Sequence, residues 1–322
     1  MFDDDDHRSM SNNYAVKLLE KLSHMRTNSD QCDFRIDIND KQFYCHKFLL
    51  IATSDYFKVL FNGNMSESHA DHIELKGFER SSHGVESMLD FCYSGSLRIH
   101  FDNIDELLNA ATHLQIHEAI DLCSQFLIES CTIKNCIDIY RIADLYSLDN
   151  VLFVIKNFLS KNFVLLISQA RDQFEQLTYE QMHTELERDN LEMYHCTEYD
   201  LFTMVCTWIE TNQTEREQYI DSLFQLIRFM LMTPEQLCDF VRDHPFIKSS
   251  EQSRILVQNA LCYYALPNRQ ALLNSLQCRI RNSLVLVAVG EVELFTLNTQ
   301  AERWDVLCQA PLEENYPVKI SF

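Results

Sequence analysis

The chain has 322 residues, of which 46% are hydrophobic and 23% charged, and its formal net charge is −21 at pH 7. The length suggests two or three domains, and the composition is typical of a globular protein that buries a sizeable core. The large acidic excess argues against a broad nucleic-acid footprint and against binding to anionic membranes, because both need a basic face.

The chain begins with an acidic run, MFDDDDHRSM, which predicts a disordered tail at residues 1–10 rather than a secretory signal or a transit peptide. Residues 11–25 form the first predicted helix. One face of this helix is apolar and is made by Tyr14, Leu18, Leu22 and Met25. Such a face must be covered by the same chain or by a partner, and the pattern alone leaves both open.

Residues 34–45 predict a β-hairpin. Apolar and polar residues alternate from Phe34 to Ile38, which is the pattern of a half-buried strand. Asn39 and Asp40 suit a turn because both tolerate a positive φ, and residues 42–45 return as the second strand. After His46 the apolar spacing changes to three and four residues, so the hairpin leads into helices.

Helices dominate the next part of the chain. Ser54 or Asp55 is expected to cap the second helix after the hairpin. Short strands are predicted at 72–75 and 97–99, and further helices at 82–93, 104–114 and 118–131. Beyond Cys131, periodic apolar segments recur as far as Pro267 without strand signals, and this predicts antiparallel helix pairs.

From Ser283 the pattern returns to strands, which are expected at 284–289, 291–297 and 303–307. The whole chain is therefore predicted to be an α+β protein, with its strands near the two ends and helices between them.

The sequence has none of the common motifs for chemistry. None of the five glycines forms G-x-G-x-x-G, G-x-x-x-x-G-K or G-x-S-x-G, which nucleotide sites and serine hydrolases use. The twelve cysteines include no C-x-x-C pair, so the commonest zinc and redox spacings are absent. We predict no enzyme, no catalytic or metal residues and no cofactor. With no signal peptide, reduced thiols are expected, and these place the chain in the cytoplasm, the nucleus or both.

Several runs in order along the chain resemble a known family. CDF, FYCHKFLL, SDYFKVLF and MSES in the first part, followed by FCYSG at 91–95, resemble the BTB (POZ) domain of kelch-like proteins. RIAD at 141–144, KNF at 161–163 and LVQNALCYY at 256–264 resemble the BACK domain that follows it. The last strands resemble one kelch blade, although Gly290 is followed by Glu291 where the family has paired glycines.

This resemblance implies a domain order. A BTB/POZ domain would occupy residues 11–131, and a helical BACK domain, whose first helices are similar to a 3-box, residues 132–275. Residues 283–322 would be a truncated kelch-like segment. A propeller needs several blades to bury their faces, so the propeller that would hold a protein substrate is expected to be absent from this chain, and the substrate is unknown.

The resemblance also implies a function. The chain would be a non-catalytic adaptor of a cullin-3 ubiquitin ligase, with Met65, Glu67 and Tyr93 in contact with the cullin. The apolar face of the first helix would cross to the partner in a homodimer. Asp33 and Lys47 match a charged pocket near that interface; the alternative for them is a partly buried ion pair that only fixes geometry.

A second function is open at this point. A BTB-domain scaffold, cytoskeletal or transcriptional, would dimerise without binding a cullin. Under either hypothesis the partners are proteins, and neither nucleic acid nor a membrane is expected.

Overall fold

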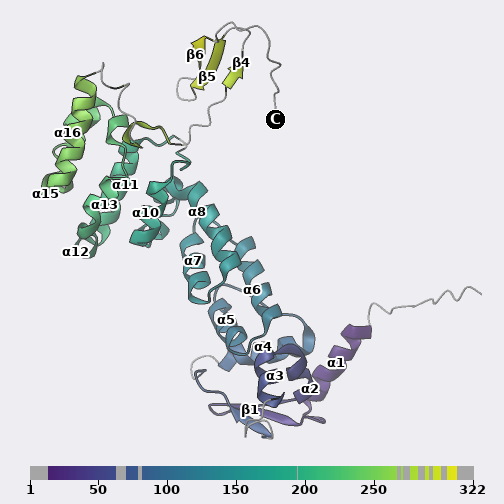
Figure 1. The fold of residues 1–322 in the computed structure, drawn as a ribbon. Helices are drawn as coiled ribbons and strands as arrows, with labels where there is room; N and C mark the ends of the chain where they lie inside the picture. The colour runs from purple at the N-terminus through teal and green to yellow at the C-terminus, as the bar shows by residue number, and fades with distance from the viewer. Residues whose placement is uncertain are drawn as a thin grey trace, which may run out of the picture. The chain divides into compact units, whose positions relative to one another are not determined.

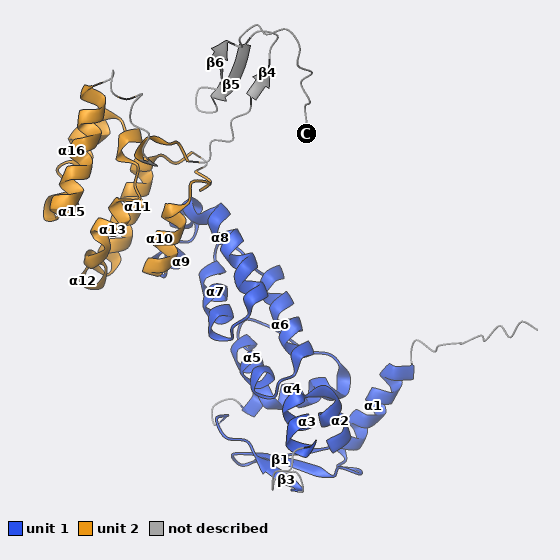
Figure 2. Ribbon diagram, in the orientation of Figure 1, with its two compact units in different colours: residues 1–176 blue, residues 177–322 orange. Residues whose placement is uncertain are grey.

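The structure, a computed structural model, describes residues 14–62, 70–78, 82–193, 195–266, 270 and 276–281, together with the backbone of three strands between 287 and 309 (Figure 1). The chain divides into two units, residues 1–176 and residues 177–322 (Figure 2). Each unit is described by itself.

The first unit begins with helix α1 and a hairpin, and continues with helices. Its elements are α1 (Tyr14–Thr27), β1 (Phe34–Ile38), β2 (Lys41–Cys45), α2 (Lys47–Thr53), α3 (Asp55–Asn62), β3 (His72–Glu74), α4 (Ser82–Ser94), α5 (Ile104–His113), α6 (His117–Glu129), α7 (Cys136–Leu145), α8 (Asp149–Gln169) and α9 (Arg171–Glu175). This order confirms the predicted α/β domain that leads into helices.

The three strands form one small sheet of order β2-β1-β3. Strands β1 and β2 are antiparallel and β3 runs parallel to β1. Asn39 adopts a φ of 51° at the turn of the hairpin, as its residue type predicts. Phe34, Ile36 and Ile38 are buried on one face of β1 and belong to the hydrophobic core that the helices complete.

Residues 97–99 do not form the predicted strand. Leu97 and Ile99 lie in an irregular segment after α4 and pack partly against the core. Their alternating pattern therefore reflects side-chain packing of an extended segment rather than a strand ladder. Gly95, just before this segment, has a φ of 66°, a conformation that glycine adopts without strain.

Two close contacts fix the helices of this unit. A Cβ on Gly84 of α4 would lie 2.4 Å from the carbonyl oxygen of Glu106, so α4 and α5 approach at a distance that only glycine permits. Further along, the buried Gln173 side chain accepts from the backbone N–H groups of Ile137 and Asp138 at 3.0 and 3.3 Å. It thereby satisfies free donors at the start of α7 from a distant part of the chain.

Among the described residues, α8 is the one helix that is long and apolar enough to cross a membrane by length and composition alone. The core helix of a folded domain passes the same test. Val151, Ile155, Leu159 and Phe163 of α8 are all buried in the first unit, with exposures of 2% or less, so one face of this helix serves as core.

The second unit is mainly helical. Its elements are α10 (Tyr179–Glu187), α11 (Glu198–Thr211), α12 (Gln213–Arg216), η2 (Glu217–Tyr219), α13 (Ile220–Phe224), η3 (Phe229–Leu231), α14 (Pro234–Gln236), η4 (Leu237–Val241), α15 (Pro245–Ser249), α16 (Glu251–Ala265) and η5 (Leu276–Cys278). Thr233, Pro234 and Gln236 are residue types that favour a helix start, and in the structure Thr233 and Gln236 form a reciprocal capping box at the start of α14.

Aromatic side chains fill the core of the second unit. Phe202, Phe224 and Phe229 contact one another with ring centroids 5.3–6.2 Å apart. Trp208 is 1% exposed, and its indole N–H donates to the carbonyl of Leu177 at 3.0 Å. The indole therefore has the polar partner that a buried tryptophan needs.

Three further strands follow at β4 (Val287–Val289), β5 (Glu293–Asn298) and β6 (Arg303–Gln309). Their backbones pair in an antiparallel sheet of order β4-β5-β6. The expected strand segments are thus present, while their assignment to a kelch blade stays a prediction.

Candidate functional site

Helix α1 presents an incompletely covered apolar face. Every residue of α1 is described and none is buried. Tyr14 and Leu18 are 67% and 44% exposed, whereas Leu22 packs partly against the core and Met25 is half-buried. The predicted stripe is therefore divided: its first half faces solvent and its second half already has partners within the chain.

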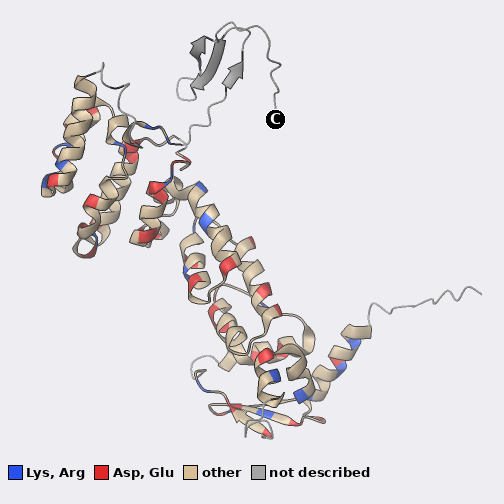
Figure 3. Cartoon of the chain, viewed as in Figure 1, with Lys and Arg blue, Asp and Glu red and all other residues tan. Residues whose placement is uncertain are grey.

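Two lysines flank the exposed apolar residues of α1: Lys17 and Lys21 follow Tyr14 and Leu18 by three residues, so they lie on a neighbouring part of the helix surface. Lys17 and Lys21 are exposed, and Figure 3 colours parts of the α1 ribbon blue for Lys and Arg, although the chain as a whole is strongly acidic. The two lysine side chains are well solvated without a partner. Tyr14 and Leu18 are therefore the residues of α1 that gain most from burial against a partner.

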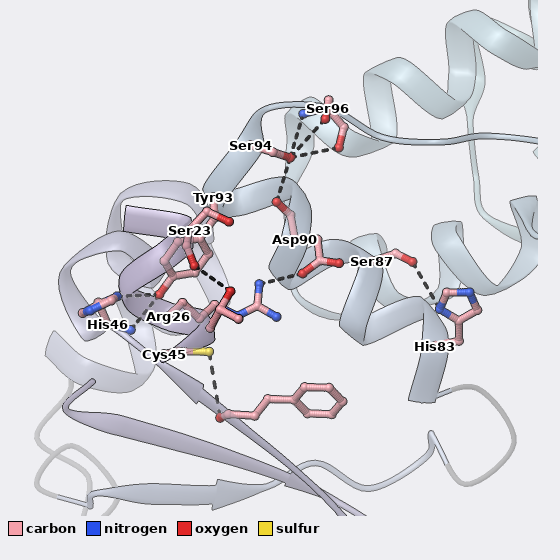
Figure 4. A network of polar contacts seen from close by, with 12 residues as sticks. Ser23, Arg26, Cys45, His46, His83, Ser87, Asp90, Tyr93, Ser94 and Ser96 are labelled. Atoms are coloured by element: carbon pink, nitrogen blue, oxygen red, sulfur yellow. Dashed lines mark hydrogen bonds and ion pairs between the residues drawn. The ribbon is translucent and has the colours of Figure 1, made fainter. Parts of the chain in front are cut away.

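The C-terminal end of α1 is fixed to the domain by Arg26. Its guanidinium donates to the Asp90 carboxylate at 2.8 Å and lies 5.1 Å from the centre of the Tyr93 ring (Figure 4). The arginine side chain is only 14% exposed, so a large part of it packs over the ring. This contact holds one end of α1 while Tyr14 and Leu18 remain outside.

Tyr93 is an interior residue. Its side chain is 1% exposed. The hydroxyl accepts from the backbone N–H of His46 at 2.9 Å and lies 2.8 Å from Nδ1 of the same histidine (Figure 4). Burial raises the pKa of Tyr93 above its usual value. Tyr93 is thus a core residue of the first unit, and its contact with a cullin stays a prediction.

The carbonyl of Asp30 determines which ring nitrogen of His46 carries the proton. His46 Nε2 lies 3.0 Å from that carbonyl oxygen, which can only accept, so Nε2 donates. Nδ1 of a neutral ring is then the acceptor, and the Tyr93 hydroxyl donates to it. His46 thus joins the turn after α1 to α4, and no pattern in the sequence indicated this link.

Asp33 and Lys47, the predicted charged pocket, lie close together and are joined through the backbone of Lys47; the pocket itself stays a prediction. Asp33 Oδ1 accepts from the backbone N–H of Lys47, the first residue of α2, at 2.8 Å. The Lys47 ammonium donates instead to the carbonyl of Ala70 at 2.9 Å, and it lies 5.5 and 5.4 Å from the ring centres of Phe34 and Phe61. The pair fixes the start of α2 and packs a cation on aromatic rings.

Met65 and Glu67, predicted to contact a cullin, lie outside the described residues. They belong to the connection between the end of α3 at Asn62 and Ala70, before β3. Their predicted contact with a cullin therefore rests on the sequence alone.

Several exposed apolar residues were missed in the sequence. On α2 and α3, Phe48 and Val59 are 57% and 65% exposed. Phe101 and Leu122 are 44% and 38% exposed, and the Phe101 ring lies 5.2 Å from that of Phe126. Leu122 and Phe126 are four residues apart on α6, so they share a face. We call Phe101, Leu122 and Phe126 the α6 cluster.

The described cysteines are all free thiols. Burial raises the pKa of Cys45, Cys123 and Cys136 to about 12, so these side chains act as small apolar groups rather than reactive thiolates. In the described part of the chain no three His, Cys, Asp or Glu side chains are grouped to hold a metal ion.

Comparison with known proteins identifies two domains. The BTB/POZ domain family matches residues 22–131, and the BACK family, described as BTB And C-terminal Kelch, matches residues 136–242. Kelch-like protein 13 of Homo sapiens is 31% identical over 315 residues, which cover 94% of this chain and 47% of the relative. Kelch-like protein 9 of Mus musculus is also 31% identical, with 94% and 50% covered.

Kelch-like protein 15 of Homo sapiens is 33% identical over 253 residues, covering 78% of this chain and 41% of the relative. The chain thus spans about half the length of the curated relatives it matches. Among solved structures, the BTB domain of zebrafish PATZ1 aligns with 38% of this chain and 99% of its own, at 22% identity and a TM-score of 0.34, a likeness too low to carry an argument.

Proposed function

Since the chain belongs to the kelch-like family of BTB–BACK proteins, we propose that it is a non-catalytic adaptor that dimerises and binds cullin-3 through its BTB domain. One observation carries the proposal: the first unit has a closed core, yet leaves apolar side chains on its surface. Tyr14 and Leu18 on α1, and Phe101 and Leu122 of the α6 cluster, are among them. Uncovered apolar groups of this kind mark protein contacts.

The dimer contact is assigned to α1. Tyr14 and Leu18 lie about one turn apart on the half of the helix that its own domain does not cover. The Arg26 contacts hold the other end of α1 in place. A second copy that buried both side chains would remove most of the exposed apolar surface of this helix from water.

The cullin contact is assigned to Met65 and Glu67, with the α6 cluster as a second part of the surface. Met65 supplies a flexible apolar side chain that adapts to a partner pocket, and Glu67 supplies a charge that orients a basic partner. With Tyr93 in the interior, Leu122 and Phe101 take its place as the exposed apolar contacts.

Dimerisation is tested by light scattering at micromolar concentration. We expect a dimer for the natural chain and a monomer for Leu18→Asp, because a charge in an apolar seam lacks a partner. Val16→Asp is the matched control: Val16 is 53% exposed and lies two residues from both Tyr14 and Leu18, so the same charge is placed on another face of the same helix. A monomeric natural chain, or a monomeric control, would contradict the assignment.

Cullin binding is tested by titration calorimetry with a cullin-3 N-terminal domain. Met65→Ala combined with Glu67→Ala should weaken binding by at least about 1–2 kcal/mol, the usual loss when an interface anchor is truncated. Leu122→Ala should weaken it as well, and Ile255→Ala, at an exposed position of the second unit, should not. If the natural chain dimerises but does not bind the cullin, it is a BTB scaffold instead.

We extend the proposal to the last segment and to the location of the protein. Residues 283–322 are proposed to contribute strands of a kelch domain, since β4, β5 and β6 pair in sequence order as the strands of a propeller blade do. The free thiols are compatible with the cytoplasm or the nucleus.

A further inference from the structure

Arg281 is one of the most completely buried charged residues among those described in the second unit, and it comes from outside the helices. It follows η5 in the segment after α16 and is 3% exposed. Its Nε donates to Glu198 Oε1 at 2.7 Å. The two terminal nitrogens donate to the carbonyls of Leu186, Arg188 and Leu226, the last two at 3.0 and 2.5 Å. One guanidinium thus joins three separate parts of the unit.

Glu198 is the carboxylate that balances this charge. It is 5% exposed at the start of α11, and its second oxygen, Oε2, accepts from the backbone N–H of Arg228 at 3.0 Å. Both carboxylate oxygens therefore have donors. Burial lowers the pKa of Arg281, and the neighbouring carboxylate of Glu198 acts against that shift. A buried ion pair tolerates desolvation only when its remaining donors and acceptors are satisfied in this way.

The residues just before Arg281 are also tied to the helices. Arg228, itself 4% exposed, donates from its guanidinium to the carbonyl of Arg279 at 2.6 Å and to the Asp189 carboxylate. The Gln277 amide donates to the carbonyl of Gln225 at 2.8 Å. We call residues 277–281 the strap. The helical part of the unit supplies the donor in the Arg228 contact, and the strap supplies the donors in the Gln277 and Arg281 contacts.

We propose that Arg281 anchors the strap to the helices of the second unit, so that the chain is held as far as residue 281 after it leaves these helices. Arg281 is a positioning residue: it acts on the chain that continues to β4 at Val287. Its guanidinium is suited to this because five donors in a rigid fork can reach several carbonyls and a carboxylate at once. Lysine at this position would supply a single ammonium and would not hold the same set.

Limited trypsin digestion of the full chain tests the anchor, because the peptide bond after Arg279 lies within the strap. Cleavage requires local opening of several residues, so its rate reports how firmly the strap is held. Mass spectrometry measures the rate of cleavage after Arg279. We expect this rate to be on the order of tenfold higher in Arg281→Met than in the natural chain. Arg281→Lys should also accelerate it.

Arg279→Met is the matched control. Arg279 is exposed and contributes its backbone carbonyl to the strap, which the substitution keeps. Cleavage after Arg281 in this variant should stay as slow as cleavage after Arg279 in the natural chain. Unchanged protection in a folded Arg281→Met variant, or fast cleavage in the control, would overturn the proposal.

A double variant separates anchoring from stability. Arg281→Met alone leaves the Glu198 charge buried without its partner and can prevent the unit from folding. Arg281→Met with Glu198→Met removes both charges, so the unit should regain a cooperative thermal transition while cleavage after Arg279 stays fast. If the double variant recovered the natural protection, Arg281 would contribute stability only, and the anchor would be rejected.

Discussion

The two units bury polar side chains in different ways. In the first unit, His46 and Tyr93 form a hydrogen-bonded pair without an ion-pair partner. Their contacts are with each other and with the carbonyl of Asp30, in the same unit. In the second unit, Arg281 and Glu198 form a charged pair that joins the strap to several helices. A neutral pair loses a hydrogen bond when one member is removed, whereas a charged pair leaves an uncompensated charge. The same degree of burial therefore makes the second unit more sensitive to a single substitution.

The largest effect should follow from Glu198→Leu in the second unit. The substitution leaves the Arg281 guanidinium buried without a carboxylate, and we expect a loss of about 3–5 kcal/mol in the free energy of unfolding. Denaturant titration with a probe in the second unit measures it. Asp243→Ala is the control, because its ion pair with Lys248 is exposed at both ends and should contribute little to stability. Equal losses for both variants would remove the contrast between buried and exposed pairs.

Gly84→Ala should lower the stability of the first unit by about 2 kcal/mol, the cost expected for overpacking. The new Cβ would lie 2.4 Å from a backbone oxygen of α5, which cannot rotate away as a side chain could. In an ordinary helix position the same change is stabilising, so the sign alone is informative. Thermal unfolding monitored in the first unit gives the answer, and an increase in midpoint would mean that α4 and α5 can separate without cost.

Tyr93→Phe should cost the first unit roughly 1–2 kcal/mol, because His46 keeps a buried backbone donor and a ring acceptor without the hydroxyl. The loss should be smaller than for Glu198→Leu, which is the point of the comparison. Cullin binding of the folded variant should be unchanged in calorimetry. A variant of natural stability that binds more weakly would restore Tyr93 as a contact residue.

A smaller effect is expected from pH in the second unit. Burial lowers the pKa of His244 below the ordinary value of a histidine, with Glu210 acting in the opposite direction. Its Nδ1 accepts from the backbone N–H of Phe246 at the start of α15, so the neutral ring is the folded form. Because the folded pKa is depressed, the contribution is full above the unfolded pKa and is lost as the pH falls below it toward the folded pKa.

Thermal midpoints measured between pH 7.5 and 5 should show this decline. His244→Asn keeps a capping acceptor but does not titrate, so the variant should show a weaker dependence on pH over that range. If the natural chain and the variant had parallel pH profiles, His244 would not be the titrating group.

Much of the fold could be predicted from local patterns in the sequence. The hairpin at 34–45, the helices that follow it and the capping box at Thr233 depend on neighbours within about one turn of chain, and the sequence shows these directly. The alternation at 97–99 was misleading because period two records which side chains are buried, and a strand also needs a partner strand. Local order was therefore predictable to the extent that its causes are local.

The sites depend on contacts between distant residues, and there the sequence was less informative. It identified Tyr14 and Leu18 as one face of a helix, but only packing against the core distinguishes them from Leu22. Asp33 and Lys47 are 14 residues apart in the sequence, and only the tertiary structure decides that Asp33 accepts from the Lys47 backbone while the lysine side chain points to Ala70. Arg281 reads as an ordinary linker residue, because its partner Glu198 lies 83 residues earlier. Residue type and spacing determine which groups a chain can bury, and only the folded arrangement determines which of them meet.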